Sequence, residues 1–389
     1  MLPSDAPLTV LPWRILVPLL QLYGCFPYRI SSTNSPPVFS LPLCLCSVAM
    51  QLLIVVLFSK WSSVNHISFL SMNMGTVSYI FSSIVMAVSL WLAGFILLIN
   101  SGAVAALLHD LSQMKNVFSP SWRHWLCNAR TLLMLAYGII ITCLSVTFTL
   151  FSVRPSTVLE TLFLTMAAVV CSVIFWLPIE LFYSVLAVQA HHLLVNTKAT
   201  ATKVSAFLAG NESFKCESDV KTTMAALVHL DAVIQEVEVK RAKTTRLFFP
   251  IINIFFVIAI MMAITSPYTI IQGSITGGGT FGSLLLASHI MGSLFHAGQM
   301  FTSQVSEAEG VLKQLRAKSQ DLSVSLKVNL VMGSLSSLLT FDVCGWYTLS
   351  YSSLLAKGEA SVHTEPRLTH DSLLWLLLFR CVCINICKM

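Results

Sequence analysis

The chain has 389 residues, of which 56% are hydrophobic and only 10% are charged. An ordinary soluble domain carries about 25% charged residues, so this composition cannot cover a water-exposed surface and excludes a soluble protein. The net charge of +6 does not indicate nucleic-acid binding, because the basic residues lie in short loops between apolar runs. The sequence therefore predicts an all-α, polytopic helical bundle in the membrane.

Membrane spans are expected where about 20 mainly apolar residues follow one another, enough to cross a hydrocarbon layer of roughly 30 Å. Six runs are clear: 41–59, 75–99, 131–152, 161–189, 248–265 and 281–303. A seventh run, 328–356, is interrupted by serines, Asp342 and Gly345, so we expect it to be an incomplete or atypical span.

The placement of Lys and Arg predicts the orientation of these spans. Seventeen of them lie in the segments on the N-terminal side of the membrane, and two, Lys60 and Arg154, lie on the other side. Because positive charge stays in the cytoplasm, the N-terminus is expected to be cytoplasmic, which argues against a G-protein-coupled receptor. The sequon at Asn211 then lies in a cytoplasmic loop and is expected to carry no glycan.

The spans and loops divide the chain into six segments. In chain order, they are the cytoplasmic segment 1–40, spans one to four in 41–189, the cytoplasmic helical loop 190–247, spans five and six in 248–303, the segment 304–356, and the atypical tail 357–389. Residues 304–356 are expected to form a cytoplasmic helix and the start of span seven.

Two cytoplasmic segments, 222–249 and 306–330, are predicted to be helical with an apolar stripe. Ser306 and Glu309 have the spacing of a capping box at a helix start. The helices are either solvated continuations of the spans, or their stripes pack together or against another subunit. The stripes consist of Leu227, Leu230, Val233, Ile234 and Val237 in the first segment, and of Ala308, Val311, Leu312 and Leu315 in the second.

No catalytic constellation is present, so we do not expect an enzyme. His289 and His296 are seven residues apart and share a helix face, but a metal pair prefers one-turn spacing and a carboxylate partner. No metal or cofactor is therefore expected. The eleven cysteines avoid the loops placed outside, which favours reduced thiols over disulfides.

Ionisable residues inside spans are candidates for function. Glu180 and Asp342 are two such residues. Each either makes a polar contact between helices or lines a vestibule, or it is an inert carboxylate that is hydrogen-bonded near the membrane boundary.

Aromatic and small polar residues gather in the predicted outer halves of the spans. Such a mixture suits a small-molecule pocket in a helix bundle, and it also suits lipid-facing helices. The candidates for ligand binding are Tyr79, Phe81, Phe148, Phe151, Phe163, Tyr268, Phe281, Ser288 and His289.

The stretch 341-FDVCGWYTLSYSSLLA-356 is similar to a phrase of the insect gustatory receptor family, Phe-x-x-Cys-Gly-Phe-Phe-x-Leu-x-x-x-Leu-Leu. Trp346 and Tyr347 replace its two aromatics, and the resemblance extends over roughly residues 1–356. The matching residues are Phe341, Cys344, Gly345, Leu349, Leu354 and Leu355.

This resemblance to a family of seven-span chemoreceptors, related to insect odorant receptors, implies a ligand-gated cation channel for taste. It implies a small tastant as ligand, a multi-pass location in the plasma membrane, and homo- or hetero-tetramers joined by the cytoplasmic helices. It places the ligand in the outer half of spans two to six, and the pore along the second half of span seven.

The tail 357–389 departs from the family. A polar segment is followed by 373–389, whose apolar run is interrupted by Arg380, so it makes a poor span. An alternative is therefore a non-conducting or truncated splice form that assembles with full-length subunits. A small-molecule transporter is a further alternative, although the inverted repeats that it predicts are not found.

Overall fold

The computed structural model describes most of the chain between residues 11 and 349. Six single residues between 136 and 147 are described as well, and all six are helical. The described ranges are 11–29, 36–64, 74–113, 157–209, 217–271, 277–319, 321–343 and 347–349.

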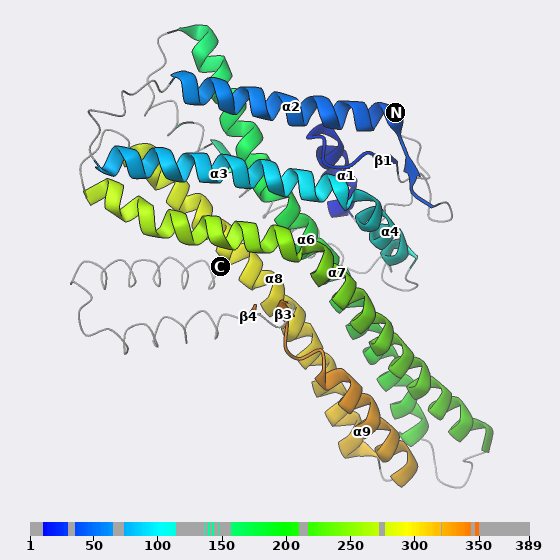
Figure 1. Cartoon of the computed structure of the whole chain (residues 1–389). Helices are drawn as coiled ribbons and strands as arrows, with labels where there is room; N and C mark the ends of the chain where they lie inside the picture. Colours follow the sequence, from blue (N-terminus) through cyan, green and yellow to red (C-terminus); the bar gives the residue numbers. More distant parts are fainter. Residues whose placement is uncertain are drawn as a thin grey trace.

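The N-terminal part contains four helices and a short hairpin (Figure 1). Helix α1 (Leu11–Leu22) leads into strands β1 (Tyr28–Arg29) and β2 (Val38–Phe39), which pair antiparallel. Helices α2 (Leu41–Val64) and α3 (Met74–Ile99) then lie side by side. Helix α4 (Ser101–Ser112) follows α3 directly and is bent from it by 63°.

Three long helices form the body of the molecule: α6 (Val158–Ala209), α7 (Glu217–Ile271) and α8 (Gly277–Lys318). All three pack against one another. Each runs without a break from a predicted span into a predicted loop, so the helical character expected of these loops is confirmed for the residues that the structure describes.

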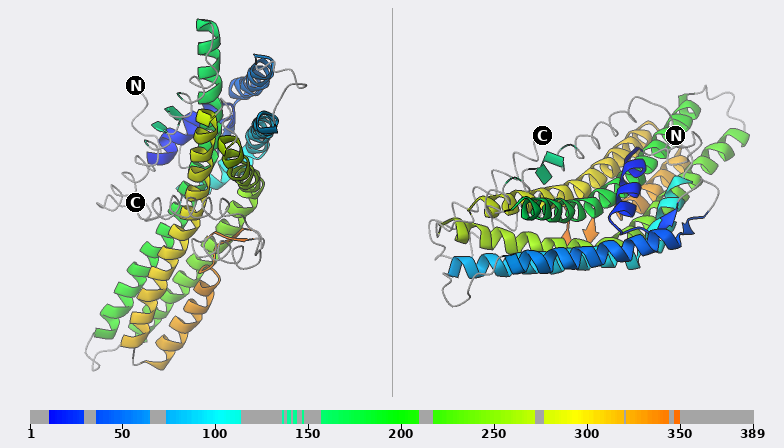
Figure 2. Two further views of the ribbon diagram at one scale, coloured as in Figure 1. Left: turned by 90° about the vertical axis from the view of Figure 1, so that its left-hand side faces the viewer. Right: turned by 90° about the horizontal axis from the view of Figure 1, so that it is seen from above.

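Helix α9 (Leu322–Ser336) packs against α7 and α8 at one end of the molecule (Figures 1 and 2). We call this end the distal bundle, formed by residues 190–209 of α6, 217–247 of α7, 304–318 of α8, and α9. After α9 in the sequence, the chain forms a second antiparallel hairpin of strands β3 (Asp342–Val343) and β4 (Tyr347–Thr348).

The predicted apolar stripes form the core of the distal bundle. None of the five stripe residues of α7 is more than 5% exposed, and Ala308, Leu312 and Leu315 of α8 are buried as well. Of the stripe residues only Val311 is half-buried. Because the stripes pack inside the chain, the packing interpretation is confirmed over the solvated one.

One expectation about this region is wrong. Ser306 does not start a helix, because α8 continues through it to Lys318, and Glu309 forms an ion pair with Lys313 at 2.8 Å instead. The run 328–356, which we expected to be incomplete or atypical as a span, is interrupted in its described part, because α9 ends at Ser336 and a hairpin follows. Residues 328–336 belong to the distal bundle, where Val328, Val331 and Leu335 are buried.

The helices α2, α3, α6, α7 and α8 contain predicted spans one, two, four, five and six. Among residues with described side chains, Leu177–Leu208 and Val220–Met262 are long and apolar enough to cross a membrane. The bent pair α3–α4 would add a third such segment if it counts as one span. The number of spans and the cytoplasmic N-terminus stay predictions.

Candidate functional site

Phe341 joins the β3–β4 hairpin to the three long helices. Its side chain is fully buried. Its ring lies 6.1 Å from that of Phe182 on α6 and 5.6 Å from that of Phe301 on α8, both edge to face. Phe182 also contacts Phe248 of α7, with ring centroids 5.5 Å apart. The chain entering the last segment is thus held at a point where α6, α7 and α8 meet.

Leu349 closes the hairpin on the other side. Its N–H donates to the carbonyl oxygen of Phe341 at 2.9 Å, and its side chain is fully buried. It lies directly against Gly298 of α8, where an added Cβ would overlap the Leu349 carbonyl oxygen and lie 2.5 Å from its Cβ. Gly298 therefore gives the hairpin the space in which it packs.

Helix α9 is held to α7 by polar contacts along its length. Asp231 of α7 accepts a hydrogen bond from the Ser334 hydroxyl at 2.9 Å and lies 3.7 Å from the Lys327 ammonium. Arg241 donates to the carbonyl oxygens of Ser337 at 3.2 Å and Thr340 at 2.8 Å. Carbonyl groups at a helix C-terminus lack helical partners, and a basic side chain stabilises them.

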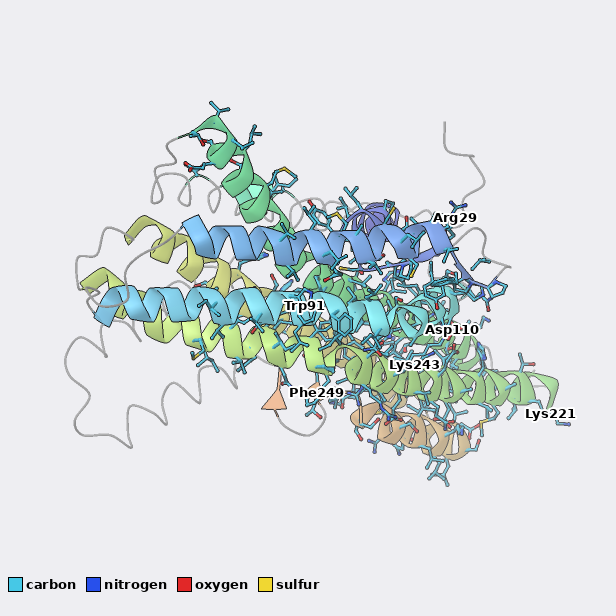
Figure 3. The ribbon with its side chains drawn as sticks, turned by 45° about the horizontal axis from the view of Figure 1, so that its top comes forward. Arg29, Trp91, Asp110, Lys221, Lys243 and Phe249 are labelled. Atoms are coloured by element: carbon cyan, nitrogen blue, oxygen red, sulfur yellow. The ribbon has the colours of Figure 1, made fainter. Side chains whose placement is uncertain are left out.

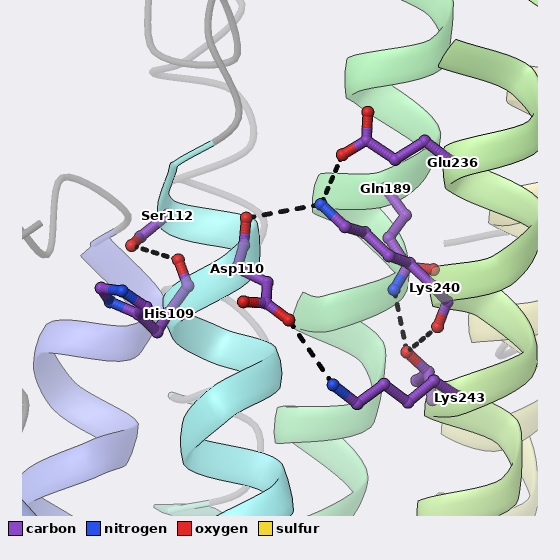
Figure 4. A network of polar contacts seen from close by, with 8 residues as sticks. His109, Asp110, Ser112, Gln189, Glu236, Lys240 and Lys243 are labelled. Carbon is purple, nitrogen blue, oxygen red and sulfur yellow. Dashed lines mark hydrogen bonds and ion pairs between the residues drawn. The ribbon is translucent and has the colours of Figure 1, made fainter. Parts of the chain in front are cut away.

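The same part of α7 holds the end of α4. Figure 3 labels Lys243 on α7 and Asp110 on α4. The Lys240 ammonium donates to the Asp110 carbonyl oxygen at 3.4 Å and to Glu236 at 2.6 Å (Figure 4). Lys243 pairs with the Asp110 carboxylate at 3.5 Å. Gln189 of α6 donates to the Thr244 hydroxyl at 2.8 Å, and both side chains are fully buried.

Polar side chains are also buried where α6 and α8 lie in the predicted spans. Glu180 on α6 and Ser288, His289 and Ser293 on α8 are all 5% exposed or less. The rings of Tyr183 and His296 stack across the two helices, with centroids 5.7 Å apart. Glu180 is thus enclosed by protein, and both interpretations of its role stay open.

Of the nine candidate ligand residues, the structure describes the side chains of two, Ser288 and His289. Both are buried on α8. Tyr79, Phe81, Phe163, Tyr268 and Phe281 lie in helices α3, α6, α7 and α8, and their side chains are outside the described part. The ligand pocket therefore stays a prediction. The remaining candidates, Phe148 and Phe151, lie outside the described residues altogether.

Two of the six motif residues, Phe341 and Leu349, have described side chains, and both lie in the hairpin core. The other motif residues, Cys344, Gly345, Leu354 and Leu355, lie outside the described residues. Strand β3 contains Asp342, whose side chain is not among those described.

Sequence reasoning missed Arg241 and Gly298. Gly298 stands inside a helical apolar run, where a glycine often marks a close approach of backbone, and that signal could have found it.

A buried corner between α1 and the first hairpin packs against the N-terminal part of α2. Gly24 adopts a φ of 71° and packs on the backbone of Ser47, so only a glycine fits there without strain. The Cys25 thiol beside it is free, and burial raises its pKa to about 12. This thiol therefore stays protonated at neutral pH.

No protein-family model and no curated protein matches the chain. Among solved structures it is similar to the insect olfactory receptor OR5 from Machilis hrabei, with a TM-score of 0.66 and 13% sequence identity. That match covers 95% of this chain and 96% of the receptor chain. The complex of the same receptor with eugenol matches with a TM-score of 0.63 and 13% identity, over 95% and 97% of the two chains. The chain therefore has the fold of an insect olfactory receptor, and the resemblance to insect chemoreceptors is confirmed at the level of the fold.

Proposed function

We propose that the chain is a subunit of a chemosensory cation channel in the plasma membrane, opened by a small tastant. The observation that carries this proposal is the shared fold, which spans 95% of this chain and nearly the whole of the receptor. That receptor has also been solved with the small molecule eugenol. Taste rather than smell is proposed because residues 341–356 resemble the gustatory receptor phrase; two residues of that phrase, Phe341 and Leu349, are buried in the hairpin.

An exposed leucine stripe on α9 supports assembly into a tetramer. Leu322, Leu326 and Leu330 are spaced by four residues and are 76%, 55% and 64% exposed. Residues four apart share one helix face. An apolar stripe on a part of the chain that we expect outside the membrane favours contact with another protein surface. We propose that the stripe meets a second receptor subunit.

We also propose that the tastant binds at the end of the molecule opposite the distal bundle, near the predicted ligand residues. Ser288 and His289 lie there as buried polar groups among apolar side chains. Pockets for small molecules combine apolar walls with a few polar groups of this kind.

The sequence of the tail supports a second candidate, a non-conducting form. Residues 357–389 depart from the family pattern, and Arg380 interrupts their apolar run. Such a chain would assemble with full-length subunits and change their response without completing a pore of its own.

Calcium imaging in cells that express the chain tests both candidates. We expect a panel of sugars and bitter compounds to include a ligand that raises calcium when the chain is expressed, alone or together with a full-length receptor. Conduction by the chain alone would exclude the non-conducting form. If the chain changes no response in either setting, while reaching the cell surface, the channel proposal is wrong.

A further inference from the structure

One turn of α7 contacts the C-terminal ends of two other helices. Lys240 and Lys243 reach the last turn of α4 at Asp110 (Figure 4). Arg241 reaches Ser337 and Thr340, directly behind α9. Both contacts place a cation against helix-terminal carbonyl oxygens, where the helix dipole favours positive charge.

The two contacts leave α7 in different directions. Successive residues of an α-helix are turned by about 100°, so Lys240 and Lys243 lie about 60° apart and share a side. Arg241 is turned by about 100° or more from both of them. The residues are neighbours in sequence, yet they hold different helices.

The turn that carries these residues is also joined to α6, by the buried hydrogen bond from Gln189 to Thr244. Within α7 itself, Glu236 pairs with Lys240, whose side chain is only 16% exposed, and so holds the ammonium group in place beside Asp110. Because the cations that contact α4 and the end of α9 lie on the same helical turn, a displacement of this turn moves all of them together.

The end of α9 leads straight to the hairpin core. Thr340, which accepts from Arg241, precedes Phe341, which packs on Phe182 and Phe301. On its other strand the hairpin is confined by Gly298. A change in the contact at Arg241 therefore acts directly beside Phe341, which is fully buried against α6 and α8.

We propose that residues 240–243 of α7 couple the position of α4 to that of α9 and the β3–β4 hairpin. A displacement of the α4 end shifts this turn and weakens or strengthens the contact of Arg241 with the α9 end, and the reverse holds by linkage. The coupling goes beyond the proposed channel function, because it requires neither a ligand nor a pore.

Hydrogen–deuterium exchange of the full chain in lipid nanodiscs, without ligand, tests this coupling. We expect Asp110→Asn to raise the exchange of a peptide covering 337–349 by about two- to thirtyfold, the range that typical coupling energies give. In turn, Arg241→Gln is expected to raise the exchange of α4 by a similar factor. The matched control is Glu307→Gln, which removes the ion pair between Lys198 of α6 and Glu307 of α8 and is expected to change neither peptide.

Faster exchange confined to the helix that carries each substitution would overturn the coupling. If Arg241→Gln does not yield folded protein, Arg241→Lys keeps the charge without the two-pronged hydrogen bond and is expected to give a smaller effect of the same sign. Because the measurement needs no conduction, a failure of the coupling and a failure of the channel proposal are distinguishable.

Discussion

At the scale of single residues, Gly298 decides whether the β3–β4 hairpin can lie against α8. We expect Gly298→Ala to destabilise the protein by about 1–3 kcal/mol, the usual cost of overpacking a tight core. The new methyl group would collide with the backbone of Leu349, which cannot move aside as a flexible side-chain tip can. The thermal midpoint of the purified protein, followed by size-exclusion chromatography after heating, measures this loss.

Gly310→Ala is the matched control on the same helix, because nothing lies within 4 Å of its added methyl group. Alanine forms helices better than glycine by about 0.5–1 kcal/mol, so this variant should melt at the same temperature or higher. Equal melting of both variants would show that Leu349 does not confine Gly298.

At the scale of elements, the outer face of α9 makes a prediction about assembly. We expect the double substitution Leu326→Asp and Leu330→Asp to lower the oligomer mass, because a buried interface would have to accept two unpaired charges. Both side chains are exposed in the single chain, so folding of the subunit should be unaffected. Native mass spectrometry of the detergent-solubilised protein gives the mass.

Val239→Asp on α7 is the control, since Val239 is 68% exposed and also belongs to the distal bundle. It should leave the mass unchanged if the α9 stripe is the contact. Unchanged assembly of the double variant would remove the stripe from the interface.

The elements also show which local patterns can be trusted. The stripe from Leu227 to Val237 predicted a packed helix, because burying its apolar face needs only the 3.6-residue period. The capping-box pattern at Ser306 failed because a cap needs a helix start, and α8 continues there. The hairpin was not predicted, because strands of two residues depend on distant partners such as Arg241 and Gly298 rather than on their own sequence.

At the scale of the whole molecule, the charge distribution predicts the topology. We expect an N-terminal epitope tag to be stained only after cells are permeabilised, and Asn211 to carry no glycan, because basic residues gather on one side of the membrane. Antibody staining with and without detergent, and glycosidase treatment, provide the measurement. Staining of intact cells would reverse the orientation and exclude a cytoplasmic distal bundle.

The site was less predictable than the fold. Hydrophobic runs located the long helices, since length and hydropathy alone determine where a span can form. The contacts that hold α7 to α4 and α9 could not be foreseen, because Asp110, Lys243 and Arg241 read as ordinary loop charges until the helices are placed. The predicted ligand pocket depends in the same way on how the spans are placed, so the aromatic residues in the spans only predict a pocket.

The unbroken helices α6, α7 and α8, of 52, 55 and 42 residues, restrict how the length of the chain can change. Inserting one residue into α7 between Val237 and Phe248 would rotate one half against the other by about 100°. That rotation would turn either the buried stripe or the packed aromatic away from its partners. Insertions and deletions should therefore be tolerated between these helices and selected against inside them, so that proteins of this fold keep the helix phase even where no sequence identity is left.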